Sequence, residues 1–382
     1  MAVPHCVVLG GGFGGVAAAR RLRERLGERV AVTLVDRRGT FMMGLRILWA
    51  LVGQATRADG TRPLDRLERI GIRILRDEIT HLDLEHKTVT TRQTTLHYDA
   101  LVVALGAELR PDLIPGYDPA GSSLYDPEQV EAIAARIATL QQGRIGIGIL
   151  GAPYKCPPAP YEAAFLIDDL LRRRGVRPRV ELEVSTPQPS SLPVAGAEVC
   201  TQVEGRLAAR GIRFLPGRKV VSVDGREVAF ERERRAYDVF IGVAPHRAPG
   251  FIKDTGLTSG EWIRPDPRTC ETTQSGVFAV GDVTEMPLAN GMMLPKAGVF
   301  AEAQGAAAAD AIAHRLADGG GAQAFDGRGY CFVETGDGMA TAIRGDFFAA
   351  PQPAIEVAMP SPEVLTQKRE FEASRLAAWF GS

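Results

Sequence analysis

Strand-like and helix-like segments alternate along most of the chain. Residues 6–9 and 30–35 are short apolar runs, and residues 16–26 between them repeat apolar positions at helical spacing. Residues 99–107 form another run that is typical of a buried strand. Alternation of this kind predicts an α/β fold with mostly parallel sheets.

The same pattern starts again in the middle of the chain. Residues 145–151 predict a strand, and residues 159–174 predict the helix that follows it. Residues 276–282 then predict a late strand, and residues 299–316 a long alanine-rich helix. From residue 330 onward we expect two or three strands, a proline-rich turn and a terminal helix.

A glycine-rich turn, Gly10-x-Gly12-x-x-Gly15, joins the first strand to the first helix. The first glycine permits a tight turn, the second lets the backbone approach a pyrophosphate, and the third lets the helix pack closely on the strand. Asp36 follows Gly15 by 21 residues, at the end of the second strand, where a carboxylate can accept hydrogen bonds from a ribose. We therefore predict a dinucleotide site. Further contacts are expected from Phe13, Gly14 and Arg37.

These segments divide the chain into three expected parts. Residues 1–108 and 246–316 would build one dinucleotide-binding domain, and residues 109–245 a second nucleotide-type domain inserted within it. Residues 317–382 would form a small α+β cap. The predicted fold class is therefore α/β, with tandem Rossmann-like domains and a C-terminal cap.

Two segments favour FAD over NAD as the dinucleotide of the first domain. Residues 273–282 resemble the second FAD motif of the glutathione-reductase superfamily, which implies that Asp282, beside Gly281, binds the ribityl chain. Residues 99–107 resemble the central motif of the same superfamily. The other cofactor contacts expected in these and neighbouring segments are Ile79, Ala104, Leu105, Gly106, Lys296 and Ala297.

The composition excludes some classes of partner. The 382 residues are 45% apolar and 24% charged, and their formal net charge is −1, which gives no reason to expect nucleic acid as a partner. No run approaches the ~18 consecutive apolar residues of a membrane span, and no signal peptide is recognisable. We expect a cytoplasmic protein, bound at most peripherally at the inner face of the membrane, and leave a homodimer open.

The second unit lacks the usual features of an NADH site. Pro153, Pro157 and Pro158 remove backbone N–H groups from the turn where a nicotinamide dinucleotide would bind. The strand at residues 180–184 ends in Ser185 and Thr186 rather than in an acid. We therefore expect that NADH does not bind there.

Cys156 stands in that turn, beside Lys155 and before the predicted helix, and both features are expected to lower the pKa of its thiol. The run from Lys155 to Glu162 resembles the family of flavocytochrome c sulfide dehydrogenase and sulfide:quinone oxidoreductase, and most of all the sulfide dehydrogenase flavoprotein subunit. Residues 329–340 resemble the segment with the second cysteine of that family, and residues 294–300 its segment at the flavin pyrimidine edge.

The resemblance implies a mechanism. Cys156 and Cys331 would form a redox disulfide over the flavin, which sulfide or a persulfide attacks, and Cys331 would donate electrons to FAD. Glu162 would accept a proton, and Lys296 would donate a hydrogen bond to the flavin. The electrons would then pass to a quinone or another acceptor, such as a cytochrome c.

The sequence departs from the family in two places. Residues 40–44 contain no cysteine, so the covalent tether of the sulfide dehydrogenases is missing and the FAD should be non-covalent. Tyr125 stands where many quinone-reducing members carry a third cysteine. A type II NADH dehydrogenase and a non-catalytic thiol or flavin redox sensor remain alternative functions.

The remaining cysteines are expected to be small core residues: Cys6, Cys200 and Cys270. The five cysteines are too widely spaced for a zinc cluster, and no metal site is predicted. The terminal segment at residues 364–380 carries an apolar stripe, which we expect to dock on the core of the protein itself rather than on a membrane.

Overall fold

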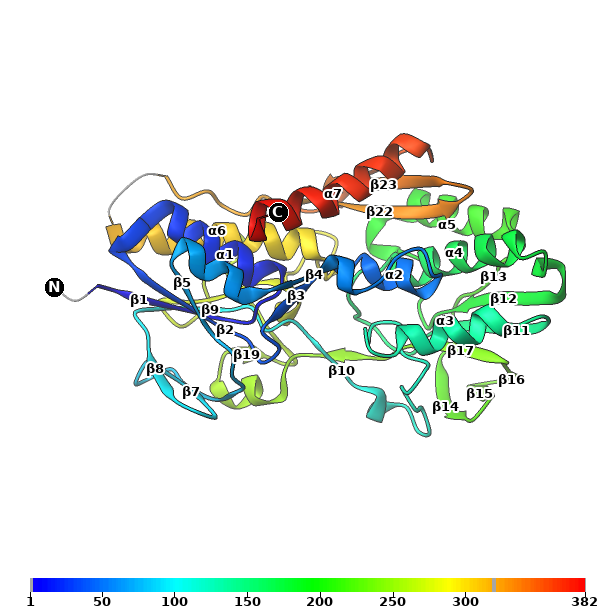
Figure 1. Cartoon of the computed structure of the whole chain (residues 1–382), viewed down its shortest axis with the longest axis horizontal. Coiled ribbons are helices and arrows are strands. Elements are labelled where there is room, and N and C mark those ends of the chain that lie inside the picture. The colour runs from blue at the N-terminus through cyan, green and yellow to red at the C-terminus, as the bar shows by residue number, and fades with distance from the viewer. Residues whose placement is uncertain (1–2, 318–320, 382) are drawn as a thin grey trace.

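The computed structural model describes residues 3–317 and 321–381. Two α/β units lie side by side along the long axis of the molecule, and the end of the chain lies across both of them (Figure 1). Each unit contains a parallel sheet flanked by helices. The predicted fold class is confirmed.

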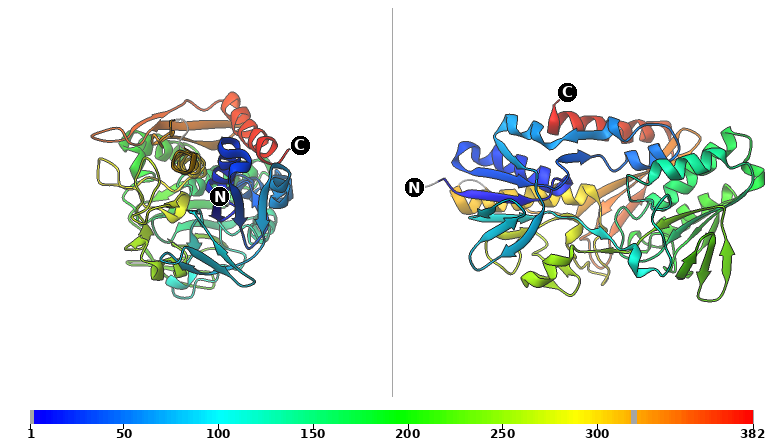
Figure 2. Two further views of the ribbon diagram at one scale, coloured as in Figure 1. Left: turned by 90° about the vertical axis from the view of Figure 1, so that its left-hand side faces the viewer. Right: turned by 60° about the horizontal axis from the view of Figure 1, so that its bottom comes forward.

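The first unit is built on a five-stranded parallel sheet of order β21-β9-β1-β2-β5. Its strands are β1 (His5–Leu9), β2 (Ala31–Val35), β5 (Ile72–Leu75), β9 (Ala100–Val103) and β21 (Val277–Ala279). Helices α1 (Phe13–Leu26) and α6 (Gly298–Ala317) lie next to each other in every view (Figures 1 and 2). They approach closely because Gly305 has no side chain: a Cβ atom there would lie 2.2 Å from the carbonyl oxygen of Gly14.

Short strands complete this unit. A three-stranded antiparallel sheet lies on the side of the main sheet away from α1 and α6 (Figure 1). The short strands are β3 (Thr40–Met42), β4 (Thr61–Pro63), β6 (Ile79–Asp83), β7 (Thr88–Thr91), β8 (Thr95–His97), β19 (Thr258–Ser259) and β20 (Trp262–Ile263).

The second unit has a four-stranded parallel sheet of order β13-β12-β11-β17. Its strands are β11 (Gly143–Ile149), β12 (Val180–Ser185), β13 (Arg213–Leu215) and β17 (Val239–Val243), with a small antiparallel sheet of β14 (Val220–Asp224), β15 (Glu227–Phe230) and β16 (Arg234–Ala236). Its helices are α3 (Val130–Thr139), α4 (Ala159–Arg173) and α5 (Ala197–Ala209).

The two connections between the units run side by side. Strand β10 (Glu108–Leu109) pairs antiparallel with β18 (His246–Arg247), and both strands lie at the predicted boundaries near residues 108 and 246. One element departs from the expected division. Helix α2 (Arg46–Leu51) belongs to the first segment in sequence, but its apolar side chains pack in the core of the second unit, with those of α3 and α4.

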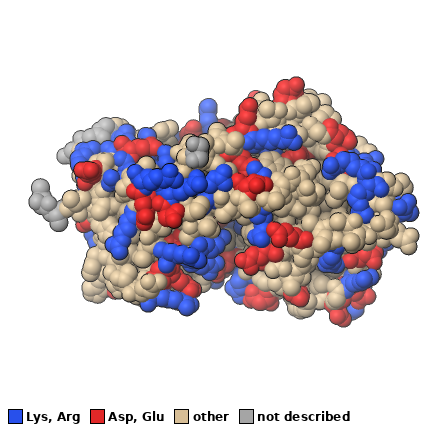
Figure 3. Space-filling model, viewed as in Figure 1, with Lys and Arg blue, Asp and Glu red and all other residues tan. Residues whose placement is uncertain are grey.

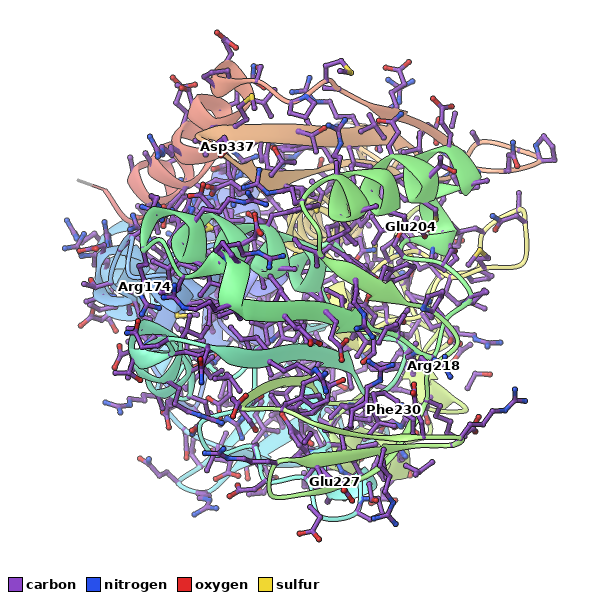
Figure 4. All side chains as sticks on the ribbon, turned by 90° about the vertical axis from the view of Figure 1, so that its right-hand side faces the viewer. Arg174, Glu204, Arg218, Glu227, Phe230 and Asp337 are labelled. Carbon is purple, nitrogen blue, oxygen red and sulfur yellow. The ribbon has the colours of Figure 1, made fainter. Side chains whose placement is uncertain are left out.

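The end of the chain forms a hairpin, a third strand and a helix. These elements are β22 (Arg328–Gly336), β23 (Met339–Asp346), β24 (Ala354–Val357) and α7 (Pro362–Phe380). At the hairpin turn, Asp337 lies over the helices of the second unit (Figure 4), where Arg210 Nη1 donates to its carboxylate at 2.6 Å.

The terminal helix packs on the protein itself, as expected. Leu365, Leu376, Trp379 and Phe380 of α7 are all buried, and the ring of Trp379 lies 5.4 Å from that of Phe41. Among residues 3–317 and 321–381, no helix combines the length and the apolar character that crossing a bilayer requires. On the face shown in Figure 3, positive and negative side chains are interspersed.

Candidate active site

The glycine turn between β1 and α1 leaves one side open. A Cβ atom on Gly10 would lie 2.4 Å from the carbonyl oxygen of Ala104, and one on Gly15 would lie 1.8 Å from that of Gly10. Both positions therefore require glycine for the packing of the chain itself. A Cβ atom on Gly12 would meet no protein atom within 4 Å, so this position faces open space.

The open space lies at the N-terminus of α1. Gly12 caps this helix without a side-chain hydrogen bond, and the first turn contains no acidic residue. Free N–H groups and the positive end of the helix dipole therefore favour an anion such as a pyrophosphate here.

Asp36 is held beside this turn by backbone N–H groups. Its Oδ2 accepts from Gly11 N at 2.8 Å, and its Oδ1 accepts from Arg38 N at 2.8 Å and from Gly39 N at 3.2 Å. The carboxylate is fixed at the end of β2, where it retains acceptor capacity for a ribose. Arg37 is exposed next to it. Ile79, the other expected contact in this region, is partly buried at the start of β6.

The two motif strands end where the cofactor contacts are expected. Strand β9 stops at Val103, so Ala104, Leu105 and Gly106 leave the sheet, and Gly106 has a φ of +68°. Strand β21 stops at Ala279, and Gly281 follows with a φ of +75°. Gly281 N donates to Gln304 Oε1 of α6 at 2.7 Å, which fixes the turn that carries Asp282.

Lys296 lies between this turn and the thiol segment. Its Nζ donates to the carbonyl oxygens of Asp282 and Thr284, each at 2.8 Å, and lies 3.4 Å from the centroid of the Trp262 ring. Burial lowers the pKa of Lys296 to about 8. Burial also raises the pKa of Asp282, although the charges of Lys296 and Lys155 oppose this. Ala297 lines the cavity described below, directly before α6.

Backbone hydrogen bonds join Cys156 to the segment of Lys296. Cys156 N donates to Lys296 O at 2.7 Å, and Tyr125 Oη donates to Cys156 O at 2.9 Å. Cys156 adopts a φ of +48°, a conformation that non-glycine residues seldom adopt without such contacts. Tyr125, at the place of the family's third cysteine, thus contributes to the conformation of Cys156.

Cys156 and Cys331 are brought together from different units. Both thiols are free, and Cys331 lies on β22. The thiol of Cys331 interacts with that of Cys156 and raises its pKa, and burial raises it further. The expectation of a lowered Cys156 pKa is wrong, because the contact with Cys331 and the burial outweigh any local effect of Lys155 or of the start of α4.

An apolar cavity of about 370 Å³ reaches Cys331. It lies between the turn before α4, the segments at residues 188–195 and 284–297, and the hairpin of the cap. Its apolar lining includes Pro153, Pro157, Leu192, Val194, Leu294, Phe300, Ile343 and Phe347.

The ring of His246 packs against that of Tyr125. The centroids of the two rings are 5.4 Å apart, and His246 Nδ1 bonds to Ala244 O at 2.9 Å. Its Nε2 has no hydrogen-bond partner among the described residues, and burial lowers the pKa of His246 to about 3. The ring is therefore neutral at physiological pH.

Glu162 lies in the first turn of α4 and is buried, with 2% of its surface exposed. It forms an ion pair with Lys368 of α7, which also bonds Glu334 of β22. Neither Lys368 nor Glu334 could be selected as a site residue from the sequence. Lys368 lies in the terminal segment at residues 364–380, and Glu334 lies in the run that resembles the second cysteine segment.

Two glycines of the second unit lie against aromatic rings. Cβ atoms on Gly146 and Gly148 would lie 2.4 Å and 2.5 Å from ring atoms of Tyr237 and Phe240. Both glycines lie within strand β11, and their space is filled by these two aromatic rings. The absence of an NADH site in this unit stays a prediction.

Comparison with known proteins identifies the family. A family model described as pyridine nucleotide-disulphide oxidoreductase matches residues 4–308. The chain belongs to this family. It is accordingly an FAD-binding flavoprotein and oxidoreductase, so the prediction of FAD is confirmed, and its non-covalent attachment stays a prediction.

Individual relatives agree with the resemblance stated from the sequence. The chain is 26% identical over 304 residues to the mitochondrial sulfide:quinone oxidoreductase of Dictyostelium discoideum, covering 75% of this chain and 66% of that protein. It is 28% identical over 240 residues to the alternative NAD(P)H-ubiquinone oxidoreductase C1 of Arabidopsis thaliana, covering 58% and 45%. The alignments thus span less than two thirds of the length of these relatives.

The solved structure of sulfide:quinone oxidoreductase from Aquifex aeolicus has the same fold. It superimposes with a TM-score of 0.90 and 22% identity, covering 99% of this chain and 91% of that one. The site fits FAD, because the open side of Gly12, the fixed carboxylate of Asp36 and the turn at Asp282 lie along the same edge of the first sheet. These residues would hold the pyrophosphate, the ribose and the ribityl chain.

Proposed function

We propose that the chain is an FAD-dependent sulfide or persulfide oxidoreductase, which passes electrons through Cys156 and Cys331 to FAD and then to a quinone or another acceptor. One observation carries this proposal. The two cysteines are 175 residues apart in sequence and belong to different parts of the fold, yet their thiols interact, and Cys156 is bonded to the cofactor segment at Lys296.

The reaction begins with the two cysteines joined as a disulfide. Hydrosulfide attacks Cys156 Sγ, the S–S bond breaks, and its electron pair leaves on Cys331 Sγ as a thiolate. Cys156 then carries a persulfide, whose S–H proton passes to Glu162. A second nucleophile removes the outer sulfur and leaves Cys156 as a thiolate. Cys156 and Cys331 then close the disulfide again, which releases two electrons, and bound FAD would supply the acceptor for them.

The cavity supports an apolar reaction partner. Its volume of about 370 Å³ far exceeds what hydrosulfide needs, and its lining is mostly aliphatic and aromatic. A quinone ring suits such a lining better than a charged dinucleotide does. The names of the relatives include both sulfide:quinone and NAD(P)H-ubiquinone oxidoreductases, so NADH is the alternative electron donor to test.

Anaerobic mixing of the purified flavoprotein with sulfide or with NADH tests the proposal. Sulfide should bleach the flavin absorbance rapidly, and NADH alone should not. Rapid bleaching by NADH would overturn the proposal in favour of a type II NADH dehydrogenase. Turnover with sulfide and a soluble quinone separates an enzyme from a redox sensor, which would be reduced once without turnover.

A further inference from the structure

Three charged side chains form a buried cluster beside the two cysteines. Glu162, Glu334 and Lys368 are 2%, 4% and 0% exposed. Lys368 Nζ donates to the carboxylate of Glu162 and, at 2.8 Å, to Glu334 Oε1. The indole N–H of Trp49 also donates to Glu334. The cluster is therefore closed by hydrogen bonds on several sides.

The cluster carries one negative charge more than it can balance internally. Two carboxylates and one ammonium sum to −1, and a buried excess charge is costly unless a proton neutralises it. Burial raises the pKa of Glu162, and the charge of Glu334 adds to this, while the charge of Lys368 opposes it. Burial would lower the pKa of Lys368, but the two carboxylates outweigh it and raise that pKa. These shifts favour a proton on both Lys368 and Glu162.

The cluster joins the two segments that carry the thiols. Glu162 follows Cys156 by six residues, and Glu334 follows Cys331 by three on β22. Lys368 reaches both carboxylates from α7. The charges of Glu162 and Lys368 act in opposite directions on the pKa of Cys156, so the cluster lies within electrostatic range of that thiol.

We propose that Lys368 and Glu334 are positioning residues that hold Glu162 at the proton affinity needed to accept the S–H proton of the Cys156 persulfide. This inference rests on the proposed function. In the step concerned, the S–H bond breaks, its electron pair stays on sulfur, and the proton binds a carboxylate oxygen of Glu162. The ammonium of Lys368 makes the carboxylate a weaker base, and the carboxylate of Glu334 makes it a stronger one.

Other charges near the cluster are already paired. On α2, Arg46 lies 5.1 Å from the Trp49 ring and bonds Glu372 of α7. Further along α4, Asp168 is bonded by arginines. Tyr330 of β22 accepts a hydrogen bond from Arg375, and Tyr161 of α4 donates one to Ser191 O. Cys331 lies on the same strand as Glu334, and Cys156 lies three residues before α4, which carries Glu162. The alternative is a purely structural role, in which the cluster only holds the cap against α4. The experiment must distinguish this role from the electrostatic one.

The two roles differ in how the rate depends on pH. We would measure the rate constant of flavin reduction by saturating sulfide in single turnovers of the holoenzyme across a range of pH. Lys368→Met removes the charge that lowers the pKa of Glu162, so the acidic limb of the profile should move to higher pH. The rate at pH 7 should fall by about 10- to 100-fold. Glu334→Gln removes the charge that raises this pKa, so its acidic limb should move to lower pH.

Two further variants serve as controls. Lys368→Arg keeps the charge and should restore a profile close to that of the wild type. Glu372 lies on the same helix as Lys368 and pairs with Arg46 of α2. Glu372→Gln breaks this ion pair and should lower the thermal stability without moving the pH profile. The protonation of sulfide itself changes with pH equally for all variants, so it does not contribute to a difference between their profiles. If Lys368→Met does not fold, Glu334→Gln and Lys368→Arg still carry the test.

A second readout does not depend on flavin reduction. In the reduced holoenzyme, alkylation of Cys156 by iodoacetamide should require a higher pH in Lys368→Met than in the wild type, because the charge that lowers the thiol pKa is gone. Profiles that stay in place, or move in the same direction in Lys368→Met and Glu334→Gln, would overturn the inference. If sulfide fails to reduce the wild-type flavin, the proposed function fails, and the alkylation result alone then decides the electrostatic role.

Discussion

Replacing Gly12 by alanine should separate cofactor binding from folding. A Cβ atom at Gly12 meets no protein atom within 4 Å, and the backbone there is extended (φ −82°, ψ −167°), so alanine introduces no clash. Alanine is a poorer helix N-cap than glycine, and we expect the apoprotein to lose about 0.5–1 kcal/mol of unfolding free energy. Urea unfolding of the apoprotein measures this loss.

The effect of Gly12→Ala on FAD should be larger. The methyl group would occupy the open space at the start of α1, where a pyrophosphate must approach the backbone N–H groups. Losing one charge-assisted hydrogen bond costs about 1.5–3 kcal/mol, which raises the Kd for FAD by about 10- to 100-fold. Titration of the apoprotein with FAD, followed by flavin fluorescence, measures that constant.

Two other glycines serve as matched comparisons for Gly12→Ala. Gly15→Ala places a Cβ atom 1.8 Å from the carbonyl oxygen of Gly10 and should prevent the first unit from folding. Gly205→Ala, within α5 and with no atom within 4 Å of the added Cβ, should stabilise the protein by about 0.5–1 kcal/mol and leave FAD binding unchanged. A wild-type Kd for FAD in Gly12→Ala would refute the assignment of the pyrophosphate to this turn.

Three further outcomes are expected. Cys331→Ser should bind FAD normally but slow flavin reduction by sulfide at least ~100-fold, a barrier increase of about 2.7 kcal/mol, while Cys200→Ser changes the stopped-flow rate little. Acid precipitation should leave all the FAD in the supernatant, because residues 40–44 contain no cysteine; a yellow pellet would contradict this. Asp168→Ala should lower the unfolding free energy in urea by about 3 kcal/mol, because three arginines bond this fully buried carboxylate, and the partly exposed Asp169→Ala should cost far less. Burial acts to raise the pKa of Asp168, but the arginines outweigh it and lower that pKa, so this stabilisation is present above the unfolded carboxyl pKa and is lost as the pH falls.

The secondary structure was predictable where the chain alternates regularly. The helix expected at residues 159–174 is α4 (Ala159–Arg173), and the one at 299–316 is α6 (Gly298–Ala317). The late strand is shorter than expected, because Gly281 turns the chain out of the sheet. An apolar pattern indicates that a segment is buried but not what it packs against, so the sequence did not show that residues 46–51 belong to the second core.

The site was predictable only where a motif carries the information. Spacing alone could not pair Cys156 with Cys331, and the resemblance to a family supplied that pairing. Local features suggested a lowered pKa for Cys156, but this pKa depends on burial and on a neighbour 175 residues away. Lys368 could not be selected from the sequence, because a lysine on an amphipathic helix is nearly always exposed. Only the tertiary packing shows that this one is buried.

The second unit has a Rossmann-like parallel sheet, and Cys156 lies in the turn between its strand β11 and its helix α4. The rings of Tyr237 and Phe240 fill the space beside the β11 glycines, and the Tyr237 hydroxyl donates to Glu183 at 2.6 Å. Under the proposed function, the thiol of Cys156 needs a second sulfur as its disulfide partner. The cap supplies it through Cys331, and this part of the cap is held by the contacts of β22 with α4 and by the ion pair of Lys368 on α7 with Glu162 on α4. Under the proposed function, the choice between sulfide and NADH as electron donor is therefore made by side chains at the junction of the three parts, rather than by the fold that this chain shares with its relatives.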